Sequence, residues 1–166
     1  MRIAGLVQDS IVDGPGLRMA VFVQGCDKAC EGCHNQEALD PRGGAELTVD
    51  EIMAEMLSNP LTDGLTLTGG EPFLQAGECA ALAAFAREKG LNVWTYSGYT
   101  FEELLNISKT DPAVSQLLEL SNVLIDGRFV LAQRSLSIKW RGSRNQRVID
   151  LQKSLALGEA VELPLN

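Results

Sequence analysis

Three cysteines lie close together in one short segment: Cys26, Cys30 and Cys33 are separated by three and then two residues. This spacing suits a loop wrapped around a cubic iron–sulfur cluster, which has four irons. Three thiolates bind only three of these irons, so the fourth is left open for a substrate or cofactor. The pattern therefore predicts a catalytic [4Fe-4S] cluster with these three cysteines as its metal ligands.

Three other interpretations compete with the open cluster, one of them being that the thiols are incidental. A structural zinc site usually takes two C-x-x-C pairs, whereas this chain has no second pair, and His34 adjoins Cys33 too closely to reach the same ion. A ferredoxin would supply a fourth cysteine with its own spacing. Cys79 falls on one helical stripe with Leu82 and Ala86, which is typical of a small buried residue. The open cluster is the favoured interpretation.

A second segment, Gly69-Gly70-Glu71-Pro72, is rich in glycine and carries one acidic group. The glycines allow the backbone to approach a neighbour closely. Glu71 can accept hydrogen bonds from an ammonium group. Alone, the segment is an ordinary turn, but beside the cysteine loop it becomes a candidate for binding the amino end of a small zwitterion.

The sequence does not decide the role of two charged segments. The turn that begins at Asp13 and ends at Arg18 is either a simple connection or a place where these charges pair or touch a partner. Arg141, Arg144 and Arg147 form either a solvated face or a clamp for a carboxylate, for which the arginine fork is suited.

The elements that position these residues alternate between strands and helices. Capping boxes at Thr48 and Thr100 predict two helix starts, and Asp111-Pro112 predicts a third. A further helix is expected from about Gln75 to Lys89. The strands are expected at 19–23, 65–68, 92–96, 122–125 and 147–151. This alternation predicts an α/β fold built from parallel βα units.

The unusual segments all follow predicted strands. The cysteine loop, the Gly-Gly-Glu-Pro segment, Ser97-Gly98-Tyr99 and Asp126-Gly127-Arg128 each come directly after one. In parallel α/β architectures, the carboxyl ends of the strands share one rim, where chemistry takes place. About five to six βα units are too few to close an eight-stranded barrel. We therefore expect a partial, open parallel β/α barrel in a single domain covering 1–166.

The composition limits the functional classes. The 166 residues contain 14 basic and 22 acidic side chains, for a net charge of −8, which disfavours sequence-independent nucleic-acid binding. We expect no membrane span, because no run of ~20 apolar residues occurs, and no signal peptide, because the first ten residues lack a sustained apolar stretch. We expect a cytoplasmic protein, in which clustered cysteines stay reduced and bind metal or react.

Taken together, these segments resemble the radical S-adenosylmethionine (SAM) superfamily, through the cysteine triplet and Gly69-Gly70-Glu71-Pro72. More narrowly, Asp13-Gly-Pro-Gly-Leu-Arg18 and Cys33-His34-Asn35 resemble the glycyl-radical-enzyme activases. The resemblance runs from about residue 5 to 151. Within that group, the segments 94–103, 123–129 and 140–147 are similar to the activases of anaerobic ribonucleoside-triphosphate reductases.

The resemblance implies a mechanism and a partner. SAM would chelate the open iron, and one electron from a low-potential donor such as flavodoxin would cleave it to methionine and a 5′-deoxyadenosyl radical. That radical would take hydrogen from a glycine on the large subunit of the reductase. The family often has an aromatic residue before the third cysteine, where this chain has Gly32. The residues expected to contact SAM are Gly69, Gly70, Glu71, Pro72, Thr95, Ser97, Asp126, Arg128 and His34.

Three alternatives stay open at this point. The chain could activate another glycyl radical enzyme of the pyruvate formate-lyase type, or act on a small molecule as a radical SAM enzyme. It could also be a non-catalytic zinc or iron–sulfur module. The short chain disfavours the small-molecule alternative, because little sequence remains to enclose such a substrate.

Overall fold

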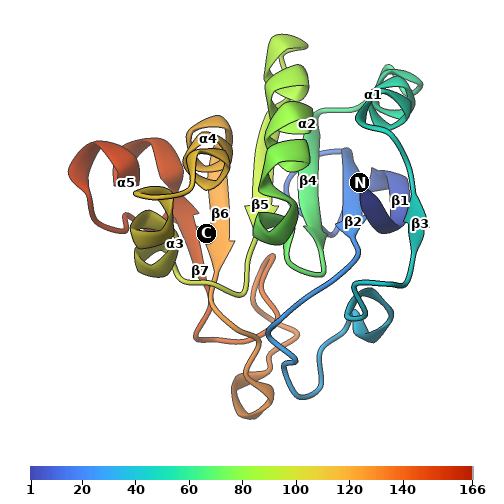
Figure 1. Cartoon of the computed structure of the whole chain (residues 1–166). Coiled ribbons are helices and arrows are strands. Elements are labelled where there is room, and N and C mark those ends of the chain that lie inside the picture. The colour runs from blue at the N-terminus through green and yellow to red at the C-terminus, as the bar shows by residue number, and fades with distance from the viewer. Residues whose placement is uncertain (166) are drawn as a thin grey trace.

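A seven-stranded sheet runs through residues 1–165, the part of the chain that the computed structural model describes (Figure 1). The strand order is β3-β1-β2-β4-β5-β6-β7. The centre of the sheet is parallel across β2, β4, β5 and β6, whereas β1 and β7 pair antiparallel with β2 and β6. The strands are β1 (Arg2–Ser10), β2 (Arg18–Val23), β3 (Ala45–Glu46), β4 (Gly64–Gly69), β5 (Asn92–Tyr96), β6 (Val123–Asp126) and β7 (Arg147–Asp150).

The four central strands are the ones that the sequence predicts, and the edges of the sheet differ from the expectation. Strands β1 and β3 were not predicted, and β7 runs antiparallel to β6. A parallel return needs a crossover helix, but the β6–β7 connection holds only the short 3-10 helix η3 (Leu131–Gln133). The fold is thus α/β with a mostly parallel sheet. The expected single domain at 1–166 includes Asn166, which lies outside the described residues.

Three of the helices begin where the sequence places their caps, whereas the helix after β7 is not predicted. Thr48 with Glu51 and Thr100 with Glu103 form complete capping boxes, and the Asp111 side chain accepts backbone N–H bonds. The helices are α1 (Val49–Leu57), α2 (Ala76–Glu88), α3 (Phe101–Ser108), α4 (Pro112–Leu120) and α5 (Leu151–Leu157), with the 3-10 helices η1 (Gln36–Ala38) and η2 (Pro72–Gln75).

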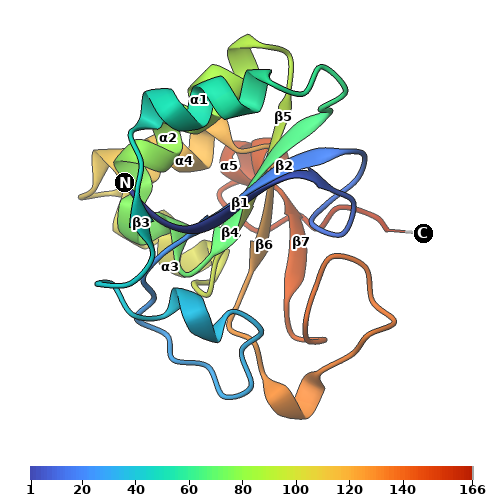
Figure 2. The same ribbon diagram turned by 90° about the vertical axis from the view of Figure 1, so that its right-hand side faces the viewer.

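All of these α-helices cover one face of the sheet (Figure 2). Because side chains alternate along a strand, Leu65, Leu67 and Val93 point into the core beneath the helices. Their neighbours Thr66 and Trp94 belong to the opposite face, which has no helical cover. The loops gather at the carboxyl ends of the parallel strands, at the bottom of Figure 1. They lie next to this open face of the sheet.

The turn before β2 is held by Arg18, whose side chain is fully buried. Its guanidinium donates to the Thr66 hydroxyl at 2.7 Å and to the carbonyl oxygens of Pro15 and Leu65 at 3.0 and 2.8 Å. The Thr66 hydroxyl donates in turn to the Asp13 carbonyl at 2.7 Å. Burial lowers the pKa of Arg18 to about 10. The arginine therefore fixes the turn through neutral oxygens and leaves the Asp13 carboxylate free of that role.

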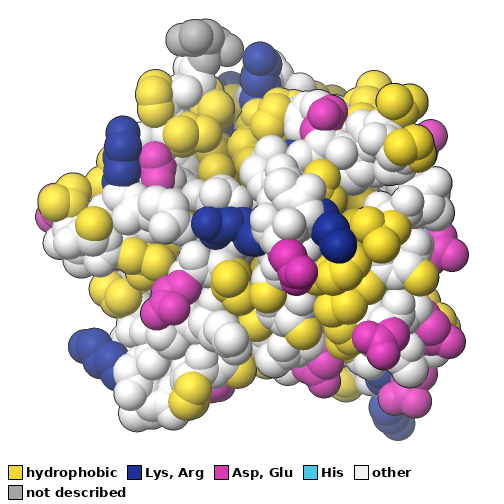
Figure 3. Space-filling model, turned by 90° about the horizontal axis from the view of Figure 1, so that it is seen from above, with side chains coloured by type: hydrophobic (Ala, Val, Ile, Leu, Met, Phe, Trp, Pro, Cys, Tyr) yellow, Lys and Arg dark blue, Asp and Glu magenta, His cyan; other side chains and the backbone are white. Residues whose placement is uncertain are grey.

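None of the helices within residues 1–165 is both long and apolar enough to cross a bilayer. Figure 3 shows the end of the molecule away from the gathered loops, where acidic and basic side chains lie among apolar ones.

Candidate active site

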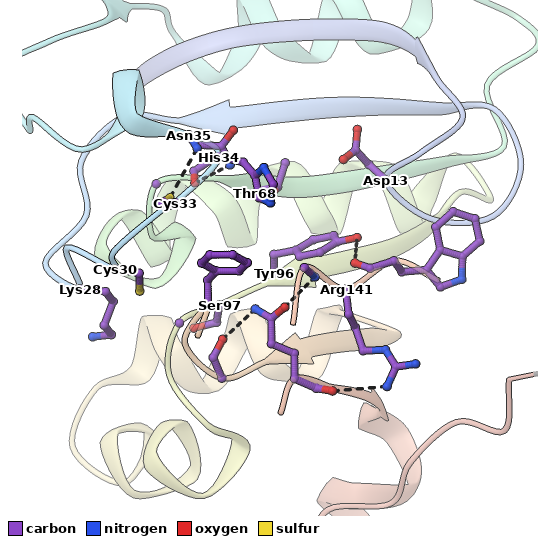
Figure 4. Close-up of a pocket in the computed structure, with 18 of the residues that line it drawn as sticks. Asp13, Lys28, Cys30, Cys33, His34, Asn35, Thr68, Tyr96, Ser97 and Arg141 are labelled. Carbon is purple, nitrogen blue, oxygen red and sulfur yellow. Dashed lines mark hydrogen bonds between the residues drawn. The ribbon is translucent and has the colours of Figure 1, made fainter. Parts of the chain in front are cut away.

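A cavity of about 760 Å³ opens on the helix-free face of the sheet, at the carboxyl ends of the parallel strands (Figure 4). A space of this size accommodates a small-molecule ligand. The sequence predicts that four strand-end segments share one rim, and the structure confirms that all four contribute to the lining. From these segments the lining residues are Cys26, Lys28, Cys30, Cys33, Gly69, Gly70, Glu71, Ser97, Gly98 and Gly127.

The cysteine loop closes on itself and on the neighbouring strand end. The N–H of Gly25 donates to the Ala38 carbonyl at 2.6 Å, and the N–H of Cys26 donates to the Leu39 carbonyl at 3.1 Å. The Glu71 N–H then donates to the Gly25 carbonyl at 2.8 Å. The base of the loop is therefore pinned at both ends, and the cysteines project from a fixed frame.

The three thiols are free and partly exposed, and all three cysteines line the cavity. Within residues 1–165, no three His, Cys, Asp or Glu side chains converge on a point that could hold one ion. Zinc needs thiolates about 2.3 Å from one centre, whereas in a cluster each thiolate binds its own iron. The Asn35 N–H also lies 3.4 Å from the Cys33 sulfur, a contact that tunes clusters. Three free thiols lining one cavity match in number the three protein-bound irons of an open cluster.

Cys79 lies in the core instead, on α2 beneath the sheet, with no exposed surface. Burial raises the pKa of its thiol well above the ordinary value, so it is held as a neutral thiol and not as a thiolate ligand. The prediction that Cys79 is a packing residue is confirmed.

Glu71 joins the loops after β4 and β5. Its carboxylate accepts hydrogen bonds from the Ser97 hydroxyl at 2.8 Å, the Gly98 N–H at 2.8 Å and the Phe73 N–H at 3.2 Å. The side chain is only 1% exposed, and burial raises its pKa to about 7. Pro72 follows as the first residue of η2 and is also buried. Glu71 therefore organises the rim through donors of the protein itself.

This burial predicts a pH-dependent stability for the metal-free protein. The pKa of Glu71 rises from an ordinary 4.5 to about 7, so the folded state holds its proton more tightly than the unfolded state. Its stabilising contribution is complete below about pH 4.5 and is lost as the pH rises through about 7. Glu71→Gln should remove about 3 kcal/mol of the decline in unfolding free energy between pH 4.5 and 8.

Urea unfolding of the apo-protein at both pH values measures this effect. Glu88→Gln, on the exposed end of α2, is the matched control and should behave as the wild-type protein does. Parallel pH profiles for the wild-type protein and Glu71→Gln would contradict the expectation.

Thr95 and Asp126 stand at strand ends, as predicted, but on the wrong face for the cavity. The Thr95 hydroxyl is buried under the helices and hydrogen-bonded to the Ser121 hydroxyl at 2.8 Å. The Asp126 carboxylate is also buried and accepts the Phe101 N–H at 2.8 Å. The alternation of side chains along the strands directs both toward the helices. The structure therefore does not bring them to the cavity as ligand contacts.

Arg147 proves to be a carboxylate clamp for the protein's own side chains. Its guanidinium bonds to Asp126 at 3.1 Å and to Glu102 at 2.7 Å, and these hydrogen bonds raise its pKa further above the ordinary value. Arg141 instead lines the cavity, while Arg128 is exposed on the loop after β6. Arg141 and Arg147 thus have different roles, and Arg128 does not line the cavity.

His34 lines the cavity beside residues that the sequence does not single out. Its ring packs edge-on against Phe129 with 5.3 Å between centroids. Tyr96 and Lys28 also line the cavity. Tyr96 could have been found from the alternation along β5, since it lies two residues after Trp94 on the helix-free face. Phe129 and Lys28 lie in loops, where no periodicity marks the side that a residue faces.

Comparisons with known proteins bear on the chemistry of this cavity. A protein-family model described as a 4Fe-4S single cluster domain matches residues 12–149. A protein of Vibrio cholerae is 35% identical over 82% of this chain and 89% of its own length. An Enterobacteria phage T4 protein is 35% identical over 82% of this chain and 86% of its own. An Escherichia coli K12 protein is 34% identical over 86% and 94%. All three are named anaerobic ribonucleoside-triphosphate reductase-activating protein.

Proposed function

The chain belongs to the family of anaerobic ribonucleoside-triphosphate reductase-activating proteins, and from this membership we propose that it is a radical SAM activase. In this role it is an oxidoreductase that generates a glycyl radical on the large subunit of an anaerobic ribonucleoside-triphosphate reductase. The observation that carries the proposal is the meeting of three free thiols and a glycine-rich strand end in one cavity. The names of the relatives support the partner.

Cys26, Cys30 and Cys33 would hold a [4Fe-4S] cluster, as the description of the family model supports. When bound, the cluster supplies the electron that cleaves SAM reductively, after reduction by a low-potential donor such as flavodoxin. The loop frame keeps the three thiols in one wall of the cavity, facing the strand ends of β4 and β5. This frame is what the chain itself contributes to cluster binding.

Other residues that line the cavity could bind the ammonium group and the adenine of SAM. The backbone of Gly69 and Gly70 would bind the ammonium group, because no side chain stands between this backbone and the cavity. Glu71 would hold the same backbone in place through its hydrogen bond from Ser97. His34, packed on the ring of Phe129, would offer an aromatic surface to the adenine. These assignments replace the earlier expectation for Thr95 and Asp126.

The sheet supports the architecture that this chemistry uses. Four adjacent parallel strands end at the cavity, and the helices cover only the outer face. We take this arrangement as the partial β/α barrel of the radical SAM type, in one domain. The uncovered face leaves the cavity open, so the glycine-bearing loop of the reductase would close it and exclude water.

One experiment tests the whole proposal. The anaerobically reconstituted protein is mixed with SAM, dithionite and the cognate reductase large subunit, and electron paramagnetic resonance is recorded. A glycine-centred doublet, with 5′-deoxyadenosine as product, is the expected result. SAM cleavage without a doublet would overturn the assigned partner, and an intact cluster without SAM cleavage would overturn the enzyme assignment in favour of a binding module.

A further inference from the structure

Lys28 lies between two of the cysteines, yet its side chain is not directed to solvent. Only 7% of the side chain is exposed, although lysine is normally among the most exposed residues. Its ammonium group lies 3.0 Å from the Asp27 carboxylate and 3.2 Å from the centre of the Tyr99 ring. A cation over an aromatic face is attracted by the ring, and more strongly when water is excluded.

Tyr99 completes this contact from another strand end. Its hydroxyl donates to the second carboxylate oxygen of Asp27 at 3.1 Å, so Asp27, Lys28 and Tyr99 form a closed set. We call these three residues the latch. Gly98 presses against the Lys28 stem, because a Cβ built at Gly98 would lie 2.8 Å from Lys28 Cγ. The latch therefore joins the loop between Cys26 and Cys30 to the loop after β5.

Tyr99 is itself fixed by the rest of the rim. Its N–H donates to the Ser97 hydroxyl at 3.0 Å, and that hydroxyl donates to Glu71. Its carbonyl accepts the N–H of Gly127 at 3.0 Å. Through Tyr99, the four strand-end segments that line the cavity become one connected structure. A movement of the cysteine loop would have to break its contacts to Tyr99 and to the Glu71 N–H.

We propose that Lys28 and Tyr99 are positioning residues that hold the Cys26–Cys30 span in place and keep a positive charge beside the cluster. This inference rests on the cluster of the proposed function, but on neither SAM cleavage nor the reductase. Reduction adds negative charge to the cluster, and a nearly buried cation stabilises added negative charge more than an exposed one does. Asp27 pairs with Lys28 but is 49% exposed, so water solvates its charge more than that of Lys28.

The test is redox potentiometry of the reconstituted protein alone, followed by electron paramagnetic resonance. Lys28→Met should lower the reduced fraction at a fixed potential by about tenfold, equivalent to about 59 mV for one electron. Lys28→Arg keeps the charge and should restore the wild-type value. Tyr99→Leu, which removes the ring, should shift the potential in the same direction and broaden the signal of the reduced cluster.

Lys89→Met is the matched control, since Lys89 also lies over a ring, Phe85, at 5.4 Å, but at the C-terminal end of α2, on the helix-covered side of the sheet. It should leave the potential unchanged. Equal potentials in Lys28→Met and Lys89→Met would overturn the proposal, as would an equal shift in Lys28→Arg and Lys28→Met. If Lys28→Met takes up no cluster but Lys28→Arg does, the result supports the latch. If neither variant takes up a cluster, the result overturns the proposal. A wild-type protein without a cluster would instead refute the proposed function.

Discussion

Cys30→Ala is expected to abolish 5′-deoxyadenosine formation and to remove most of the bound iron. The Cys30 thiol lines the cavity and lies outside the packed core, so its loss takes away a proposed cluster ligand without leaving a hole in the fold. The unfolding free energy of the apo-protein should change by no more than about 0.5 kcal/mol. Iron analysis, product chromatography and urea unfolding of the variant measure the three quantities.

Cys79→Ala is the matched control and should show the opposite pattern. Its thiol is fully buried in the core, so the smaller side chain should cost about 1 kcal/mol of stability. Iron content and SAM cleavage should stay at the wild-type level. Loss of iron from Cys79→Ala would identify it as a fourth ligand, and unfolding of Cys30→Ala would favour a structural metal module over an enzyme.

The central part of the fold follows from local signals in the sequence. Capping residues such as Thr48 and Thr100 act within a few positions, so a helix start can be located without knowing the fold. The order of strands and helices then places the strand ends on one rim. The shared cavity of the cysteine loop and the Gly-Gly-Glu-Pro segment could therefore be predicted from sequence alone.

Predicting the face of the sheet on which a residue lies needs one further step. The positions of Thr95 and Asp126 near strand ends predict contact with a ligand, but position along a strand does not decide which side of the sheet a residue faces. Counting in twos along β5 from Val93, which packs beneath the helices, assigns Thr95 to the core. The same count places Tyr96 at the cavity, where the structure has it.

Contacts between distant loops could not be predicted in this way. Lys28 and Tyr99 are 71 positions apart, and their meeting depends on how two loops fold over the rim. Arg147 likewise finds Asp126 only because β7 returns antiparallel beside β6. Neither the folding of a loop nor the direction of a strand produces a periodic pattern in the sequence. The sequence alone therefore does not decide whether a charged residue in such a segment is solvated or paired.

Gly70→Ala is expected to lower SAM cleavage about 10²-fold, because the Gly-Gly-Glu-Pro segment is packed against the base of the cysteine loop. A Cβ at Gly70 would lie 2.2 Å from the Gly25 carbonyl oxygen and 2.9 Å from the Ala38 carbonyl oxygen. Both are backbone atoms in the hydrogen-bonded frame of the loop, so neither can turn aside as a side chain would. The two segments must separate, which displaces Cys26 from the strand end that it faces.

Gly77→Ala separates this steric effect from the loss of a glycine as such. A Cβ at Gly77 meets nothing within 4 Å, and in the first turn of α2 alanine is favoured over glycine by up to about 1 kcal/mol. This variant should keep full iron content and cleavage and unfold at equal or higher urea. Gly70→Ala should instead lose iron, lose cleavage and cost about 1–3 kcal/mol of stability. If both variants bind iron and cleave SAM alike, neither iron binding nor SAM cleavage depends on the close approach of the two loops.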